Sequence, residues 1–586
     1  MESQKQENLL RLATSSTRQE REKSEILNVG ISEEENLWEI IVKYTGEIDQ
    51  LQSMGIGVEK MLSGYAILTL PKQAIEVVST LPMIEYLELP KSLIYGIYEA
   101  KIASCIPQVR QSPYGLTGKG VLLAVIDSGI DYFLEDFKKE GKTRIRYLWD
   151  QTGVINTKEG KLPPEGFLLG VEYNKEQIDK ALQSSTREEA LQIVPQVDER
   201  GHGTAVTAVA ASSHPQQLLQ GVAPDCDLLI VKLRDVGNSG YPSTTELMRA
   251  VTYCIQKARL LAQSLVINLS FGNSYGPRDG SSLIEQFLDQ AATMGKTSIC
   301  IGCGNEGVSG GHFAGNVRET KTVELAIGRR EPTVNVQLWK FYEDDFSIEL
   351  EAPDGTVFPV VLESNPGRQT FIWKSTKVLV YAGVPSPYSS KQEVFFVFLP
   401  LEDYLEVGIW TFHFQIQNIL VGEIQLYLPA KQQRNEGTGF LRQEPALTIT
   451  NPATAAGAIT VAAYNDATEA YADFSGRGEE YKKGDLLWEE RNKPDLAAPG
   501  VGIIASSVGG GVQSYSGTSF ASPMVSGSAA LLMEWGIVQG NDPYLYGEKM
   551  KAYLRRGAKS IRGESVYPNN RVGWGALCVA DSIPGE

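Results

Sequence analysis

Five short apolar runs, separated by stretches with helical periodicity, constrain the fold of this 586-residue chain more than any other feature. Each run is a few residues long, rich in Val, Ile and Leu, and bounded by polar or turn residues. Runs of this kind that alternate with helices are typical of a parallel sheet covered on both faces. The sequence therefore predicts an α/β fold with a parallel sheet flanked by helices, built on the runs "VLLAVID", "DLLIVKL", "SLVINLS", "TSICIG" and "AITVAA".

A second pattern interrupts the first between residues 312 and 445. The helical periodicity stops there, and short β-branched and aromatic runs follow one another at regular spacing. The runs are "TVNVQLW", "FSIELEA", "TVFPVVL", "QTFIW", "KVLVYAG", "EVFFVFL", "WTFHFQI" and "EIQLYL". The α/β pattern resumes at 446, so we predict an all-β sandwich or jelly roll inserted between two parts of an α/β domain, residues 98–311 and 446–586.

The N-terminal part of the chain has its own pattern. Residues 36–97 contain alternating strands and a helix that begins after a proline, which predicts a small α+β unit. Residues 1–35 are polar and charged, and we expect an N-terminal extension there. The apolar cluster Leu9, Leu10 and Leu12 predicts a short helix at most.

Charge and composition narrow the classes of partner. The formal net charge of −17 argues against nucleic acid and anionic membranes, because both select basic surfaces. No apolar run is long enough to span a bilayer, and the N-terminus lacks the apolar core of a signal peptide, so we expect an intracellular protein. We accordingly expect the six cysteines to be reduced. Cys300 and Cys303 form a C-x-x-C; zinc would need a second pair of ligands, so buried structural thiols are the preferred interpretation.

Three polar residues in distinctive surroundings carry the candidate chemistry. Asp127 ends the run "VLLAVID", at the sheet edge where ligands and catalytic groups gather in α/β proteins. His202 lies between two glycines at the start of an Ala/Val-rich helix, and Ser519 lies in "SGTSFASP" at the start of a small-residue helix. Taken singly, each has a plain structural interpretation: a turn-capping aspartate, a structural imidazole and a helix N-cap.

Together with Asn305 in "GCGNEG", the three residues supply every part of a nucleophilic site. A serine hydroxyl needs an imidazole to remove its proton, and the imidazole needs a carboxylate to hold its tautomer. The oxyanion formed by attack on a carbonyl needs donors, which an Asn side chain and a backbone N–H can provide.

At this point the chain resembles the subtilisin-like serine proteases, in which the triad occurs in the order Asp, His, Ser. The matching stretches cover about 115–311 and 446–586, and they are "AVIDSGID", "GHGT", "GVAP", "VINLSFG", "GNEG", "PDLAAPG", "GTSFASPMVSG" and "VGWG". The resemblance implies that Ser519 is the nucleophile, His202 the general base and acid, and Asp127 its partner. It implies an oxyanion hole from the Asn305 side chain and the Ser519 N–H, and a substrate pocket lined by Ser270, Phe271, Gly272, Gly302, Cys303 and Gly304.

Departures from the family pattern qualify this resemblance. A long stretch separates Asp127 from His202, and we interpret "YLWDQTG" and "VEYNKEQIDKAL" within it as parts of a loop. Ala205 follows "GHGT" where the family often has a histidine. The Asn-rich loop that binds calcium in many members is missing, so we predict no metal site and no cofactor.

The resemblance also implies a role for the N-terminal unit. Small domains in this position are propeptides that assist folding and then fill the active-site cleft, which would place self-cleavage within 93–101; the alternative is an ordinary accessory domain. The whole layout resembles the Csp-type germination proteases of clostridial spores, which activate the precursor of a cortex-lytic hydrolase. The implied partners are a precursor protein and the cleaved propeptide, and the implied location is the spore. Two alternatives stay open: a self-processed scaffold or signalling protein, and a housekeeping subtilase.

Overall fold

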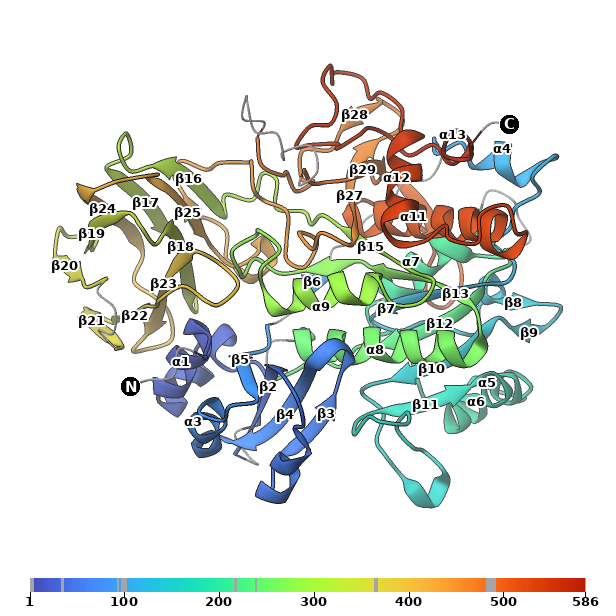
Figure 1. Ribbon diagram of the computed structural model, residues 1–586, viewed down its shortest axis with the longest axis horizontal. Coiled ribbons are helices and arrows are strands. Elements are labelled where there is room, and N and C mark those ends of the chain that lie inside the picture. The colour runs from blue at the N-terminus through green and yellow to red at the C-terminus, as the bar shows by residue number, and fades with distance from the viewer. Residues whose placement is uncertain are drawn as a thin grey trace.

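The computed structural model describes residues 5–32, 36–91, 94–95, 103–214, 219–237, 240–362, 367–480 and 492–584. Three bodies of secondary structure are visible in Figure 1: a small N-terminal sheet, a central sheet between helices, and an all-β part on the opposite side from the C-terminal helices. The predicted fold class is confirmed in each of them. The domain limits drawn from the sequence remain predictions.

The central sheet confirms the five apolar runs as neighbouring parallel strands. They are β7 (Val121–Asp127), β12 (Asp227–Lys232), β13 (Ser264–Leu269), β15 (Thr297–Gly302) and β27 (Ile459–Asn465). The strand order is β11-β10-β12-β7-β13-β15-β27-β28, with β29 (Leu496–Pro499) also on β27 and β28 (Ala470–Tyr471) at one edge. Parallel pairing throughout the centre of the sheet brings the carboxyl ends of these strands to one edge.

Strand β7 shows why such runs lack polar alternation. Val121, Leu123 and Val125 pack with helices α7 (His202–Ala211) and α11 (Thr518–Met533) on one face. The intervening residues of β7 pack with helices α8 (Thr244–Leu261) and α9 (Leu283–Ala292) on the other face. Because both faces of the sheet are covered, every position of β7 is buried. All of its residues are apolar except the terminal Asp127.

The expectation of a long loop between Asp127 and His202 is wrong. The stretch contains β10 (Ile145–Asp150), β11 (Val171–Asn174), α5 (Lys175–Leu182) and α6 (Arg187–Ile193). Strand β10 pairs in parallel with β12, and β11 pairs antiparallel with β10, so the stretch extends the central sheet. Burial of Leu148 and Trp149 against the sheet accounts for this, and it depends on contacts with a strand about eighty residues further along.

The N-terminal unit is an antiparallel sheet of order β1-β2-β4-β3, with β5 also paired to β2. Its elements are β1 (Ile31–Ser32), β2 (Leu37–Tyr44), β3 (Gly57–Lys60), β4 (Tyr65–Pro71), α3 (Lys72–Ser79) and β5 (Ile84–Glu88). The predicted strands and the helix that begins after Pro71 are confirmed. Strand β3, "GVEK", is short and polar and had no apolar alternation to predict it.

The first described residues of the chain form two short helices that pack against other parts of the molecule. Helix α1 (Asn8–Ser15) and helix α2 (Arg18–Glu22) follow each other, and Leu9, Leu10 and Leu12 are fully buried. These leucines share one apolar cluster with the N-terminal sheet and with Tyr381 and Phe395 of the all-β part, as the position of α1 in Figure 1 suggests. The polar stretch therefore connects two parts of the molecule.

The predicted sandwich is confirmed as two antiparallel sheets of orders β16-β25-β18-β23-β22-β21 and β20-β19-β24-β17-β26 around one apolar core. The strands are β16 (His312–Asn316), β17 (Thr322–Ile327), β18 (Val334–Phe341), β19 (Asp345–Glu351), β20 (Val357–Val360), β21 (Gln369–Trp373), β22 (Thr376–Ala382), β23 (Lys391–Pro400), β24 (Gly408–Asn418), β25 (Glu423–Tyr427) and β26 (Gly439–Phe440). The short strands β16 and β26 contain glycine and lack β-branched residues, so propensity does not reveal them.

Short elements complete the chain. They are β6 (Ile94–Tyr95), α4 (Ile106–Arg110), β8 (Lys138–Lys139), β9 (Lys142–Thr143), β14 (Phe271–Gly272), β30 (Ile503–Ser506), β31 (Val512–Tyr515), α12 (Gly547–Arg556) and α13 (Val579–Ser582).

The expectation that all six cysteines are reduced is wrong for two of them. Cys105, just before α4, and Cys578, just before α13, form a disulfide with a Cα–Cα distance of 4.9 Å. The two residues are 473 positions apart, and only the folded chain brings helices α4 and α13 together. The other four cysteines are free and buried, in agreement with the interpretation of Cys300 and Cys303 as structural thiols.

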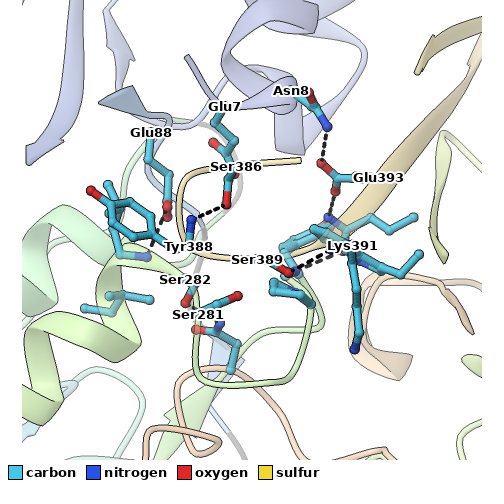
Figure 2. Close-up of a pocket in the computed structure, with 18 of the residues that line it drawn as sticks. Glu7, Asn8, Glu88, Ser281, Ser282, Ser386, Tyr388, Ser389, Lys391 and Glu393 are labelled. Carbon is cyan, nitrogen blue, oxygen red and sulfur yellow. Dashed lines mark hydrogen bonds between the residues drawn. The ribbon is translucent and has the colours of Figure 1, made fainter. Parts of the chain in front are cut away.

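A polar pocket lies where the three bodies meet. Figure 2 shows Glu7 and Glu88 from the N-terminal unit on one side and Glu393 of β23 on the other. The Lys91 ammonium lies 2.6 Å from a Glu7 carboxylate oxygen and 2.5 Å from one of Glu88. Asn8 donates to Glu393 Oε2 at 3.2 Å. Three carboxylates and one ammonium are thus confined to one buried junction.

This junction predicts a loss of stability at alkaline pH. Burial raises the pKa of Glu393 to about 7 and that of Glu7 to about 8, although hydrogen bonds from Asn8 and Gln337 lower the former and Lys91 lowers the latter. Because the folded-state pKa values lie above the ordinary value of 4.5, the stabilisation is fully present below about pH 4.5 and is lost as the pH rises through 7 and 8.

Denaturant unfolding at pH 6 and pH 9 measures this effect. We expect the wild-type chain to be less stable at pH 9, and Glu393→Gln to reduce the difference because the amide carries no titrating proton. The change Glu165→Gln at an exposed position is the control and should leave the difference as it is. An equal difference in all three proteins would contradict the prediction.

Candidate active site

Asp127 is positioned by the end of strand β7. Its side chain is 1% exposed, and its Oδ1 lies 2.6 Å from His202 Nδ1. The backbone N–H of Ser128 donates to the same oxygen at 2.7 Å. A carboxylate bonded to Nδ1 keeps the proton on that nitrogen and leaves Nε2 as the basic one.

His202 is the first residue of helix α7, and its neighbours allow the helix to approach β7. A Cβ atom at position 203 would lie 2.3 Å from the carbonyl oxygen of Gly129, so only glycine fits there. Asp198 joins the two segments: its carboxylate accepts from Ser128 Oγ at 2.7 Å and from the Thr204 backbone N–H at 2.8 Å. The sequence analysis missed Asp198, because an aspartate in a loop carries no local signal.

Ser519 is the second residue of helix α11 and is 2% exposed. Its hydroxyl donates to the Ser270 carbonyl oxygen at 2.9 Å, and the Ser270 hydroxyl donates to the Ser519 carbonyl oxygen at 2.9 Å. The next residue, Phe520, contacts the His202 ring edge-on, with ring centroids 5.7 Å apart. Helix α11 therefore places the Ser519 hydroxyl against Ser270, the residue before β14. It also places Phe520 against the His202 ring.

Asn305 lies on the loop after β15 and is oriented by the start of α11. Its Oδ1 accepts from the Thr518 backbone N–H at 3.0 Å and from the Thr518 hydroxyl at 3.2 Å. These bonds use only the oxygen of the amide, and its donors are on Nδ2. Asn305 and Ser519 line the same pocket. The Ser519 N–H belongs to the first turn of α11, whose N–H groups have no intrahelical acceptor. Two donors are thus available beside one hydroxyl.

A pocket of about 340 Å³ adjoins these groups. Five of the six residues expected from the sequence line it, namely Ser270, Phe271, Gly272, Gly302 and Gly304. Residues that the sequence analysis missed also line it, namely Glu306, Ala430, Gln432, Thr450 and Thr518.

Cys303, the sixth expected residue, is not part of the lining. Its thiol lies 3.2 Å from the Ser475 hydroxyl within the core, and burial raises its pKa to about 12.

An extended segment from the N-terminal unit lies along this site. Strand β6 pairs antiparallel with β14, with Tyr95 opposite Phe271 and Ile94 opposite Gly272. The rest of the range 93–101, in which self-cleavage was expected, lies outside the described residues. The described residues of this range, Ile94 and Tyr95, form the strand next to the pocket.

Within the described part of the chain, no group of three or more His, Cys, Asp or Glu side chains could hold a metal ion. Nor does any helix in that part have the length and apolarity to cross a bilayer.

Two family models match this chain. Residues 4–91 match the Csp protease B prodomain, and residues 118–326 and 435–575 match the subtilase family. The two subtilase segments flank most of the sandwich.

Individual relatives are similar over different extents. The chain is 23% identical over 491 residues to the minor extracellular protease Vpr of Bacillus subtilis, which covers 80% of this chain and 52% of that relative. It is 30% identical over 153 residues to the serine protease AprX of the same organism, covering 24% of this chain and 32% of AprX. The chain thus spans about half or less of the length of these two proteins.

The solved structure of the CspB protease from Clostridium perfringens is similar over nearly all of its length. The TM-score is 0.73 at 34% sequence identity, with 82% of this chain and 95% of that chain covered.

Proposed function

Because the chain belongs to the subtilase family, we propose that it is a serine endopeptidase whose reacting groups are Ser519, His202 and Asp127. The observation that carries the proposal is the 2.6 Å contact between Asp127 and His202, whose ring also contacts Phe520, the residue after Ser519. A buried carboxylate, an imidazole and a hydroxyl at a helix start are the groups needed for acyl transfer.

The groups act in two half-reactions. The Ser519 hydroxyl, which donates to the Ser270 carbonyl at rest, rotates toward His202 and transfers its proton as Oγ bonds to the scissile carbon. Asn305 Nδ2 and the Ser519 N–H donate to the oxyanion. The C–N bond then breaks, and His202 gives its proton to the departing amine. Water, deprotonated by His202, attacks the acyl-enzyme, and the proton returns to Ser519 as the new carboxyl group leaves.

We propose that the first bond cut lies in the chain's own N-terminal region. The match of residues 4–91 to a protease prodomain and the pairing of β6 with β14 both support self-processing. Strand β6 ends at Tyr95, opposite Phe271, and the carbonyl of Ser270, the residue before Phe271, accepts the Ser519 hydroxyl. The scissile carbonyl must adjoin this hydroxyl, so we expect the cut to follow Gly96.

We further propose that the processed enzyme activates a precursor protein, such as a spore cortex-lytic hydrolase, inside the spore. The similarity to a Csp prodomain and to the C. perfringens CspB protease supports this assignment. The alternative is a self-processed scaffold or signalling protein with little activity on other proteins. The pairing of β6 with β14 favours that alternative, because a retained prodomain would cover the site.

Self-processing is tested by comparing wild type with Ser519→Ala. Intact-mass analysis should show a wild-type chain cut after Gly96 and an uncut variant, and a serine-reactive fluorophosphonate should label only the wild type. Ser528→Ala is the matched control, because its hydroxyl bonds to the Met524 carbonyl within the same helix, away from the pocket. An uncut and unlabelled wild type would rule out an active nucleophile, whereas a labelled protein that cuts no other protein would favour the scaffold.

A further inference from the structure

The pocket at the junction of the three bodies, which we call the junction pocket, is lined by more acidic than basic side chains. Figure 2 shows Glu7 and Glu88 across the pocket from Glu393, and the charged lining residues are Glu7, Glu88, Lys91, Lys391 and Glu393. The Lys391 ammonium lies 3.7 Å from Asp279, so Lys91 is the ammonium that pairs with lining carboxylates. Among the described residues, none lines both this pocket and the one beside Ser519.

Two of the carboxylates have hydrogen-bond acceptor capacity to spare. Glu393 Oε1 accepts from Gln337 Nε2 at 2.6 Å, and its Oε2 accepts from Asn8 Nδ2 at 3.2 Å. Glu7 Oε1 lies 2.6 Å from Lys91 Nζ, and its Oε2 accepts one backbone N–H at 3.0 Å. An ionised carboxylate offers about four acceptor sites, so each of these groups can accept further bonds from a donor in the pocket.

Asn451 adds an acceptor from the central body. It is 2% exposed and lines the junction pocket, and its backbone N–H and carbonyl both pair with Asn273, so its side chain is the part that borders the pocket. Its Nδ2 donates to Ser282 Oγ at 2.9 Å, and the Ser282 hydroxyl donates to Glu285 at 2.5 Å. This order of donors fixes the amide orientation. The buried Oδ1 of Asn451 therefore remains an acceptor without a partner among the described residues.

The pKa values of the carboxylates indicate that a positive charge would be stabilised here. Burial raises the pKa of Glu393 to about 7 and that of Glu7 to about 8, although Lys91 lowers both. A second cation beside these groups would favour their ionised forms. A metal ion does not fit, because no group of three or more His, Cys, Asp or Glu side chains in the described part of the chain is arranged to hold one.

We propose that the junction pocket binds a small organic compound with a primary ammonium group, and that this ligand helps to hold the three bodies together. A primary ammonium has one positive charge and three N–H donors, which match the unused acceptors of Glu7, Glu393 and Asn451. These acceptors come from the N-terminal unit, the sandwich and the central body. Because the ligand contacts all three only when they are assembled, its binding free energy stabilises the assembled chain.

Ligand-observed saturation-transfer NMR on the full-length Ser519→Ala chain tests the proposal. The probe is n-propylammonium, and 1-propanol is its neutral analogue of similar size. We expect the ammonium to bind at least about tenfold more tightly than the alcohol, because charge-assisted hydrogen bonds are the stronger ones. Its affinity should rise between pH 6 and pH 8, because more of Glu393 and Glu7 is ionised at the higher pH while the probe keeps its charge.

Two variants and a control identify the groups that bind the probe. Glu393→Gln and Glu7→Gln each remove a negative charge and keep the side-chain shape. Each should weaken propylammonium binding at least about tenfold and reduce the rise in unfolding temperature that the probe causes in the parent chain. Glu324→Gln, the same change at an exposed position of β17, should leave the affinity within about twofold. Because the two variants lie in different bodies, the test stands if one of them fails to fold.

The inference is overturned if propylammonium binds no better than 1-propanol, or if its affinity is the same in the parent chain, Glu393→Gln and Glu7→Gln. Binding without a rise in unfolding temperature would overturn the role of the ligand in holding the bodies together. All of these measurements use a chain without the Ser519 hydroxyl, so a failure of the proposed function would not affect them.

Discussion

Asp127→Asn is expected to slow peptide-bond cleavage by about 10⁴-fold while leaving the fold intact, as the corresponding change does in a serine protease with this triad. Asp127 Oδ1 is bonded both to His202 Nδ1 and to the Ser128 N–H. An amide of the same shape has no negative charge to stabilise the imidazolium. Its NH₂ group, if turned toward the ring, would force the proton onto Nε2, where the base is needed.

The rate of self-cleavage after refolding measures this effect, with the cut chain quantified by intact mass. Asp473→Asn serves as the control, because the Asp473 side chain is 83% exposed and has no part in the proposed mechanism. We expect the control to process at the wild-type rate. A loss of less than tenfold in Asp127→Asn would show that His202 does not depend on this carboxylate.

Arg249→Met is expected to produce the largest loss of stability. Arg249, on helix α8 of the central body, is fully buried and lies 2.7 Å from Glu39 and 3.0 Å from Glu59, both in the N-terminal sheet. It also lies 3.1 Å from Glu246 of its own helix. Burial opposes its charge, but the three carboxylates raise the pKa of Arg249 above its usual value.

Removing this cation takes the Arg249 partner from buried Glu59 and leaves Arg234 as the cation beside Glu39 and Glu246. Such a change costs about 3–5 kcal/mol of unfolding free energy. Denaturant unfolding in the Ser519→Ala background, in which the chain stays in one piece, measures the loss. Lys60→Met is the control, because Lys60 and its partner Asp49 are both exposed, and we expect little change there. Equal stability of the two variants would contradict the role of Arg249 as the charge that joins the N-terminal sheet to α8.

Local sequence was sufficient for most of the central fold. Strand β7 is predictable because seven consecutive positions are covered by helices on both faces, which forces an apolar run ending in Asp127. Helices α7 and α11 are predictable from small residues and from the glycines that precede His202 and Ser519. Eight strands of the sandwich, β18 to β25, were predicted where β-branched and aromatic residues repeat. Strand β16, which lacks β-branched residues, was missed, and so was β17, although its sequence "TVELAI" has the same character as the predicted strands.

The candidate site shows the same division. The sequence indicated Asp127, His202, Ser519 and Asn305, because each belongs to a short stretch whose residue types serve one chemical task. It did not indicate Asp198, Thr518 or Glu306, which lie close in sequence to His202, Ser519 and Asn305, and it did not indicate Gln432, which reaches the pocket from a distant part of the chain. It wrongly placed Cys303 in the pocket, because a backbone segment beside a pocket can direct its side chain into the core.

The sequence by itself determined which segments become strands and helices and which residues can perform acyl transfer, because periodicity and residue type act within a few positions of the chain. Only the tertiary structure decided what surrounds them. The disulfide across 473 residues, the acidic junction of Glu7, Glu88 and Glu393, and the place of Ala430 and Gln432 in the pocket beside Ser519 all join parts of the chain that are distant in sequence. Such contacts depend on how complete bodies pack against one another, and no local pattern encodes that packing.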